Sequence, residues 1–305
     1  MKTLVTGISG YIGSGLVPRL QRDGHDVRGL ARDPARVSAR ASVVRGDAVS
    51  GAGLAEAMDG VEVAYYLIHS MESSSDGPFA DRELRAAHNV ARAAREAGVR
   101  RVVYLGGLIP AAGARPSAHL GSRLAVEEAI LRGVPDSVAL RASIVIGARS
   151  RSFRFLVRLV ERLPVLALPA WREHRTRPID GRDVLEYLAR AASLREARGR
   201  SLDIGGPEVM TYAELIDSIR DAMLVGRPTV RLGRLNLTPV ASRVAAAVAA
   251  EDHALIGPLM EGLETDLLPR DENASSLFGL RLHSFEAAIE RALRDWEATE
   301  PLAAR

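Results

Sequence analysis

Short apolar runs alternate with longer amphipathic stretches through the first half of the chain. Six runs rich in Val, Leu and Ile predict buried strands of a parallel sheet. They lie at residues 4–5, 27–30, 43–44, 61–68, 102–105 and 138–140. The clearest helical pattern covers residues 81–97, with apolar residues on one face and Gly98 as its stop. Strands and helices in alternation predict an α/β fold with a Rossmann-like, doubly wound parallel sheet.

The alternation loosens after residue 147. Residues 178–200 read as a strand end and a helix that return to the sheet, and residues 211–214 form a capping box that predicts a further helix start. We therefore expect a dinucleotide-binding Rossmann domain of residues 1–147, with 178–200 returning to it, and a smaller, mainly helical substrate region of residues 148–177 and 201–305.

Three glycines spaced three apart follow the first strand. Gly7 permits a tight turn, Gly10 lets the backbone approach a phosphate, and Gly13 lets the next helix pack closely on the sheet. The helix that begins near Tyr11 would point its free N–H groups at a dinucleotide pyrophosphate. The motif alone is weak evidence, but the strand and helix pattern around it strengthens the prediction.

Composition narrows the chemistry. Apolar residues make up 47% of the 305 residues and charged ones 26%, as in ordinary globular proteins. The chain has no cysteine, which excludes disulfides, thiolate metal sites and a cysteine nucleophile. Its seven histidines include no pair at a metal-binding helical spacing, so no metal site is predicted. No signal peptide or membrane span is evident, and we expect a cytoplasmic protein.

The basic residues are almost entirely arginines, and Lys2 is the single lysine. Four of them, Arg151, Arg154, Arg158 and Arg162, form a stripe at helical spacing. The stripe could meet nucleic acid or acidic lipid, but a solvated helix face is favoured because no aromatic residues or wider basic field accompany it. We therefore expect neither a nucleic-acid nor a membrane partner.

The end of the second predicted strand selects between NAD and NADP. An acidic residue there binds the ribose 2′-hydroxyl of NAD, whereas arginines suit the 2′-phosphate of NADP. Arg32 stands just past the strand and Arg36 lies four residues on, which favours NADP, and NADPH over NADH. The alternative is that Asp33 takes the hydroxyl and the arginines are solvated.

Several motifs together resemble a known superfamily. They are Thr-Gly-Ile-Ser-Gly-Tyr-Ile-Gly at 6–13, Gly-Asp at 46–47, Tyr-Tyr-Leu-Ile-His-Ser-Met at 65–71, Leu-Arg-Ala-Ser-Ile-Val-Ile-Gly at 140–147 and Gly-Gly-Pro-Glu at 205–208. In these the chain resembles the atypical, extended-like short-chain dehydrogenase/reductases, most of all the NmrA-related, NAD(P)H-binding, epimerase-like proteins. The resemblance covers nearly the whole chain and is specific for fold and cofactor rather than for reaction.

The resemblance implies a cofactor site. Its pyrophosphate residues would be Gly7, Ser9, Gly10, Tyr11, Ile12 and Gly13, and its 2′-phosphate residues Arg32 and Arg36. Asp47, next to Ala48, would accept the adenine amino group, and Leu67, Ile68 and His69, with Gly106 and Gly107 on the next strand, would line the route to the nicotinamide. His69 could equally be a structural strand-end histidine.

The chain departs from the superfamily at its reactive residues. The resemblance implies a serine at the end of the fifth strand and a Tyr-x-x-x-Lys pair on the next helix. Here the strand ends Leu105-Gly-Gly, and the helix carries His119-Leu-Gly-Ser-Arg123. His119 and Arg123 share a helix face and could donate a proton and hold ribose hydroxyls. Alternatively, Arg123 pairs with Glu127 one turn on and His119 merely opens the helix.

Candidates for the substrate pocket come from segments that leave the sheet pattern. They are Gly147, Phe153, Trp171, Arg175, Arg177 and Met210. In an extended stretch Arg175 and Arg177 would share a face and could hold an acidic or quinonoid oxygen. Trp171 is more typical of core packing than of a ligand platform.

Two functions from different classes follow. The leading hypothesis is an NADPH-dependent reductase of a small carbonyl, quinone or enone substrate. The alternative is a non-catalytic NADP-binding redox sensor or scaffold of NmrA type, favoured by the missing Tyr-Lys pair. Sugar-nucleotide epimerisation ranks last because it needs the absent tyrosine. The partner expected is a small molecule, and the protein would be a monomer or a homodimer.

Overall fold

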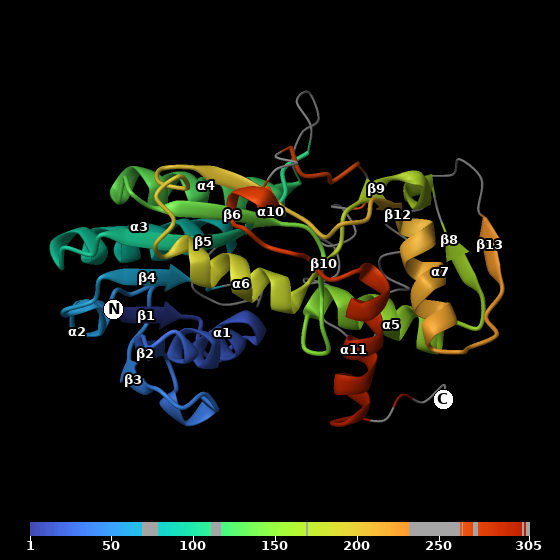
Figure 1. Ribbon diagram of the computed structural model, residues 1–305, viewed down its shortest axis with the longest axis horizontal. Coiled ribbons are helices and arrows are strands. Elements are labelled where there is room, and N and C mark those ends of the chain that lie inside the picture. Colours follow the sequence, from blue (N-terminus) through green and yellow to red (C-terminus); the bar gives the residue numbers. More distant parts are fainter. Residues whose placement is uncertain are drawn as a thin grey trace.

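The computed structural model describes residues 1–68, 79–110, 117–168, 170–231, 263, 265–270, 274–300 and 302. A large parallel sheet with helices on both faces occupies one end of the molecule, and a smaller region of short strands and helices occupies the other (Figure 1).

Seven parallel strands form the large sheet, in the order β11-β6-β5-β4-β1-β2-β3. Their bounds are β1 (Lys2–Thr6), β2 (Asp26–Ala31), β3 (Ser42–Arg45), β4 (Val63–Tyr66), β5 (Arg101–Gly107), β6 (Val138–Ala142) and β11 (Ser201–Ile204). The chain order reverses between β1 and β4, and such a switch point is where doubly wound sheets bind nucleotides. The predicted Rossmann-like fold class is confirmed, and each of the six predicted strands lies in this sheet.

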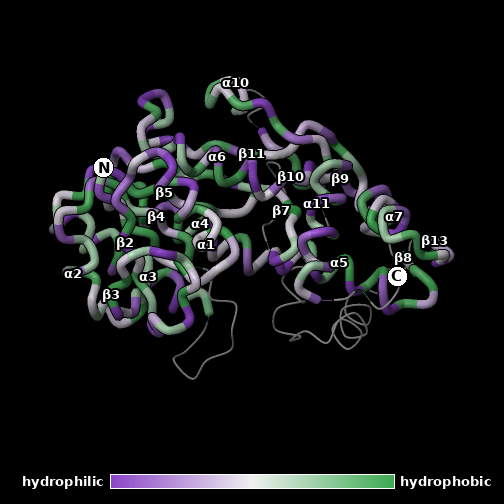
Figure 2. The backbone as a smooth tube through the Cα atoms, turned by 60° about the horizontal axis from the view of Figure 1, so that its bottom comes forward, coloured by the Kyte–Doolittle hydropathy of each residue, from purple (hydrophilic) through white to green (hydrophobic). Residues whose placement is uncertain are grey.

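Helices cover both faces because successive strand residues point to opposite sides. On β1, Leu4 belongs to one core cluster and Val5 to the other. The helices that flank the sheet are α1 (Tyr11–Arg22) and α6 (Gly181–Ala191), which pack on each other, and α2 (Leu54–Met58), α3 (Phe79–Glu96) and α4 (Ala118–Gly133). A short 3-10 turn, η1 (Pro34–Arg36), follows β2. Figure 2 shows the mixed polar and apolar colouring along these helices that one buried face produces.

Two segments differ from the expected domain division. β11 is the seventh strand of the sheet, although the sequence predicts its residues in the smaller C-terminal region, and α10 (Ala274–Leu277) packs against it. Conversely, β10 (Ile179–Asp180) pairs with β7 (Val145–Ile146) outside the sheet. The helix of the 178–200 segment, α6, packs on α1 and on β5 and β6, whereas the short strand of that segment pairs outside the large sheet.

The smaller region is built around three helices with one apolar core. They are α5 (Arg151–Arg162), α7 (Tyr212–Ala222) and α11 (Phe285–Glu297). The two-stranded ribbons β8 (Leu166–Leu168) with β13 (Thr229–Arg231) and β9 (Arg175–Thr176) with β12 (Met210–Thr211) complete it, together with the 3-10 turn η2 (Ala170–Glu173). The expected capping box opens α7, since Thr211 and Glu214 bond each other's backbone N–H groups. None of the described helices has the length and apolar character needed to cross a membrane.

The arginine stripe on α5 lies partly inside this region. The guanidinium groups of Arg154 and Arg158 stand 4.1 and 5.0 Å from the ring centre of Trp296, and both pair with Glu300. The Arg158 side chain is only 11% exposed. The solvated-face interpretation is therefore wrong for these two arginines. Their cation–π contacts with Trp296 and their ion pairs with Glu300 hold α11 and the residues after it against α5.

Candidate functional site

The turn between β1 and α1 has the geometry of a phosphate cradle. Gly7 adopts φ +73°, and a Cβ there would lie 2.5 Å from the carbonyl oxygen of Leu67. A Cβ on Gly13 would lie 2.3 Å from the carbonyl oxygen of Gly7, so the helix approaches the turn as closely as glycine allows. The N-cap residue Gly10 has no side chain with which to bond the first N–H groups of α1. These groups can therefore face an anion, and the turn fits a dinucleotide pyrophosphate.

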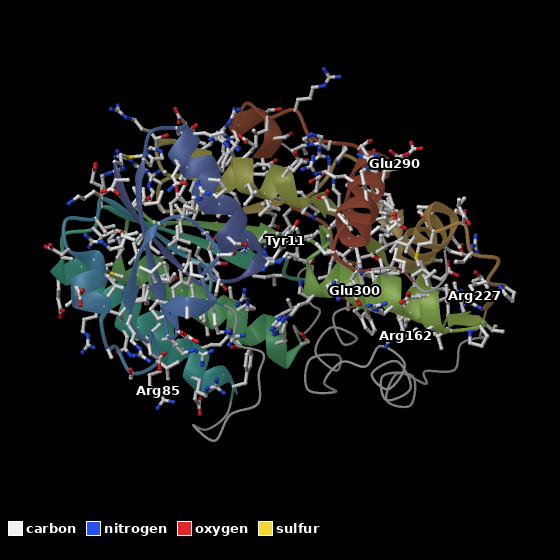
Figure 3. The ribbon with its side chains drawn as sticks, turned by 90° about the horizontal axis from the view of Figure 1, so that it is seen from below. Tyr11, Arg85, Arg162, Arg227, Glu290 and Glu300 are labelled. Atoms are coloured by element: carbon white, nitrogen blue, oxygen red, sulfur yellow. The ribbon has the colours of Figure 1, made fainter. Side chains whose placement is uncertain are left out.

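Tyr11 connects this turn to the smaller region. A Cβ on Gly147 or Gly181 would lie 1.8 or 2.1 Å from the Tyr11 hydroxyl, so both glycines make room for the ring. Figure 3 shows Tyr11 at the end of α1 that faces the smaller region. Burial raises the pKa of Tyr11 to about 12. Gly147 thus has a packing role, and its predicted contact with substrate stays a prediction.

At the end of β2, Asp33 and the two arginines Arg32 and Arg36 differ in their contacts. The backbone N–H of Ala35 donates to Asp33 Oδ1 at 3.1 Å, which caps η1. Arg32 and Arg36 are exposed. One oxygen of the Asp33 carboxylate is therefore bonded to the protein's own backbone, and the exposed guanidinium groups of Arg32 and Arg36 are accessible to a ligand.

The predicted adenine loop is fixed by a residue that the sequence analysis missed. Asp47 Oδ1 accepts the N–H of Val49 at 3.0 Å, and the amide of Asn89 on α3 donates to the carbonyls of Ala48 and Val49 at 3.0 and 2.9 Å. Asparagine is a poor helix former, so its place in the middle of an alanine-rich helix was the available signal.

The other predicted cofactor residues gather at the same sheet edge. Parallel pairing sets Thr6, Tyr66 and Tyr104 side by side, so Leu67 and Ile68 after β4 adjoin the end of β5 with Gly106 and Gly107. Ser9 and Ile12 lie in the glycine turn and in the first turn of α1. His69 lies outside the described residues. The part of the predicted site that can be placed therefore forms one continuous edge across β1, β4 and β5.

Arg123 is buried, and its carboxylate partner is Glu83 and not Glu127. Its Nη1 faces Glu83 Oε1 at 3.4 Å, and its Nη2 donates to the Leu105 carbonyl at the end of β5 at 3.2 Å. The Ser122 hydroxyl donates to the other oxygen of Glu83 at 3.0 Å. Glu127 instead binds Arg141, so the proposed Arg123–Glu127 pair is wrong. Glu83, which is 40 positions from Arg123, was missed.

His119 lies in the first turn of α4, which Ser117 caps. Its ring stacks against Phe79 at 6.0 Å. Burial, with a smaller contribution from the Arg123 charge, lowers the pKa of His119 to about 4. At pH 7 roughly one molecule in a thousand would carry the imidazolium. The residue therefore offers a neutral imidazole rather than a ready acid.

Most of the predicted substrate residues already make contacts within the protein. Phe153 has no exposed surface and Trp171, packed on Tyr212, is 6% exposed, so core packing accounts for both. The Arg175 side chain bonds to Asp266 at 2.7 and 2.9 Å, and Arg177 donates to the Gly206 carbonyl at 2.5 Å. The two arginines thus hold protein segments, whereas Met210 on β12 remains half-buried.

Comparison with known proteins agrees with this geometry. Residues 7–126 match a family model described as NAD(P)H-binding. The chain is 27% identical over 255 residues to cinnamoyl-CoA reductase 1 of Oryza sativa subsp. japonica, covering 71% of this chain and 74% of that protein. It is 28% identical over 113 residues to a 3-beta-hydroxysteroid dehydrogenase of Mycolicibacterium neoaurum, covering 34% of this chain and 31% of that one.

Solved structures share the fold over nearly the whole chain. UDP-glucose 4-epimerase from Thermotoga maritima, solved with UDP-glucose, superimposes with a TM-score of 0.74 at 14% identity, covering 98% of this chain and 99% of that one. MoeE5, solved with UDP-glucose and NAD, gives a TM-score of 0.72 at 20% identity with the same coverage. At these identities the comparison establishes the fold alone.

The buried Glu83–Arg123 pair yields a stability prediction. Glu83→Ala leaves a buried guanidinium without its carboxylate, so we expect the free energy of unfolding to fall by about 3 kcal/mol. The matched control is Glu128→Ala, which breaks the exposed Glu128–Arg132 pair on α4 and should cost less than about 0.5 kcal/mol. Urea unfolding of both variants measures the difference, and equal effects would contradict the account.

The environment of His119 predicts its titration. Because the folded state holds the pKa of His119 below the unfolded value of about 6.5, proton uptake favours the unfolded chain, and this residue's contribution to stability is lost as pH falls from about 6.5 towards 4. In NMR spectra of histidine-labelled protein, the resonance that disappears in His119→Gln should titrate near pH 4. A midpoint above about pH 6 would show that the imidazole is solvated.

Proposed function

We propose that this protein is an NADPH-dependent reductase of a small carbonyl, quinone or enone. Its residues 7–126 match an NAD(P)H-binding family model, and its fold is that of a solved UDP-glucose 4-epimerase. The observation that carries the proposal is the glycine turn, where Gly7 and Gly13 leave no room for a Cβ beside an uncapped helix N-terminus. A relative named as a reductase supports this reaction class.

The preference for NADPH follows from the end of β2. One carboxylate oxygen of Asp33 already accepts a hydrogen bond from the η1 backbone, which makes Asp33 a weaker acceptor for a ribose hydroxyl. Arg32 and Arg36 are exposed on the same short segment, and two guanidinium groups suit a 2′-phosphate dianion. MoeE5, which was solved with NAD, is the reason to test both cofactors.

The reactive end of the cofactor would lie beyond Leu67, Ile68 and the two glycines of β5. A reduced nicotinamide supplies a hydride when bound. Gly107 offers no side chain to obstruct a flat ring, and the neutral His119 can form a hydrogen bond but carries little charge. The guanidinium of Arg123 is already bonded to Glu83 and to the Leu105 carbonyl. Arg123 would therefore act on the cofactor through its electrostatic field and by fixing the Leu105 carbonyl.

The reaction is tested by mixing the protein with NADPH and a panel of quinones, enones and aldehydes. Absorbance at ~340 nm follows loss of the reduced nicotinamide. We expect turnover with at least one class of acceptor and faster turnover with NADPH than with NADH. Tight NADPH binding without turnover across the panel would overturn the reductase proposal.

Cofactor choice gives a second prediction. Replacing Arg32 and Arg36 together with alanine should weaken NADPH binding about 10- to 100-fold, the loss expected for charged hydrogen bonds to a phosphate, and leave NADH binding unchanged. Arg95→Ala, which removes an exposed arginine near the end of α3, is the matched control. Isothermal titration calorimetry measures the affinity of the wild type and of each variant for NADPH and for NADH. Equal weakening for NADH would mean that the arginines do not read the 2′-phosphate.

A second candidate is a non-catalytic NADP-binding redox sensor. It is favoured by the buried ion pair of Arg123 and by the absence of a hydroxyl at Gly106 and Gly107. A sensor should retain a partner protein in a manner that depends on NADPH or NADP⁺, and His119→Ala should not alter that retention. Affinity purification with each cofactor form distinguishes it from the reductase.

A further inference from the structure

A pair of hydroxyl groups lies at the carboxyl end of β6, beside β5, whose last three residues, Leu105 to Gly107, carry no hydroxyl. The oxygens of Ser143 and Thr176 are 2.9 Å apart, and either can be the donor. Ser143 directly follows β6, and Thr176 belongs to β9 of the smaller region. The pair therefore joins the sheet edge to the region that we expect to cover it.

The register sets this pair next to the nicotinamide end of the predicted site. On β5 and β6, Gly107 lies opposite Ala142, and the N–H of Leu108 donates to the Ala142 carbonyl at 3.1 Å. Ser143 is thus one position beyond Gly107 on the neighbouring strand, and paired strands lie about 4.8 Å apart. A hydroxyl is present at this edge, although not on β5.

Burial gives the two hydroxyls different roles. Thr176 has no exposed surface, whereas Ser143 is half-buried. Either hydroxyl can donate in this pair. In the arrangement in which Thr176 donates, Ser143 accepts that bond and its own proton can point to a ligand, because a hydroxyl accepts and donates at the same time. Thr176 is held in place by its pairing with Met210 on β12 and by a bridge to Leu267. It is therefore a rigid positioning group for an accessible donor.

We propose that Ser143 donates a hydrogen bond to the oxygen of a carbonyl substrate, and that Thr176 is the positioning residue that orients it. The inference rests on the proposed reductase function. As the carbonyl carbon gains a hydride, the electron pair of the C=O bond moves to the oxygen, and a preorganised donor stabilises the charge that develops there. A water molecule supplies the proton that completes the alcohol.

The test uses binding as well as turnover. Protein loaded with NADP⁺ cannot reduce an aldehyde, so the equilibrium binding of ¹³C=O-labelled 4-nitrobenzaldehyde and its infrared carbonyl band report the hydrogen bond directly. We expect the band to lie at lower frequency in the wild type than in Ser143→Ala, and aldehyde affinity to fall up to about tenfold in that variant. Ser143→Thr retains a hydroxyl and should restore both, and Thr176→Val should give an intermediate band.

Ser193→Ala, which removes an exposed hydroxyl after α6, is the matched control and should match the wild type. An unchanged band in Ser143→Ala, or no aldehyde binding to the NADP⁺-loaded wild type, would overturn the proposal. If the wild type transfers no hydride from NADPH but its aldehyde band still depends on Ser143, the reductase function fails while the oxygen site stands. If Ser143→Ala reduces aldehydes as fast as the wild type and its carbonyl band is unchanged, the oxygen site fails while the reductase function stands.

Discussion

The backbone contact between Gly7 and Gly13 is the constraint on which the site depends. With a Cβ forbidden at both positions, α1 can start directly over the end of β1, and its first N–H groups face the switch point of the sheet. The same approach carries Tyr11 to Gly147 and Gly181, which admit its ring. One close contact therefore shapes a place for a pyrophosphate and also connects it to the region expected to hold the substrate.

The cofactor half of the site could be predicted from sequence because its signals are local. Glycine spacing, apolar strand runs and the residues at a strand end all act within a few positions. A short strand at residues 202–204 could be predicted, but its place in the large sheet was harder, because the fully buried Asp203 is neutralised by Arg141 and Arg270 from distant segments. Glu83 and the stacking of Arg154 on Trp296 were missed for the same reason. Such contacts join residues that no short window contains.

The part of the site expected to hold the reacting groups, around His119 and Arg123, differs from the superfamily pattern in its charges. The position where the resemblance implies a lysine holds an arginine whose charge is balanced by a buried carboxylate, and its neighbour His119 is kept neutral. Hydroxyls at this edge come from β6 and β9 instead of β5. A chain with these replacements would depend less on an ionisable acid and more on neutral hydrogen-bond donors held in fixed positions.

The most direct test of the account is calorimetric titration of NADPH into the wild type and into Gly13→Ala. We expect the wild type to bind one NADPH per chain, and the folded variant to bind at least about 100-fold more weakly, since its Cβ would displace the turn that faces the pyrophosphate. A folded Gly13→Ala protein that binds NADPH as tightly as the wild type would contradict the assignment of the cofactor to this turn.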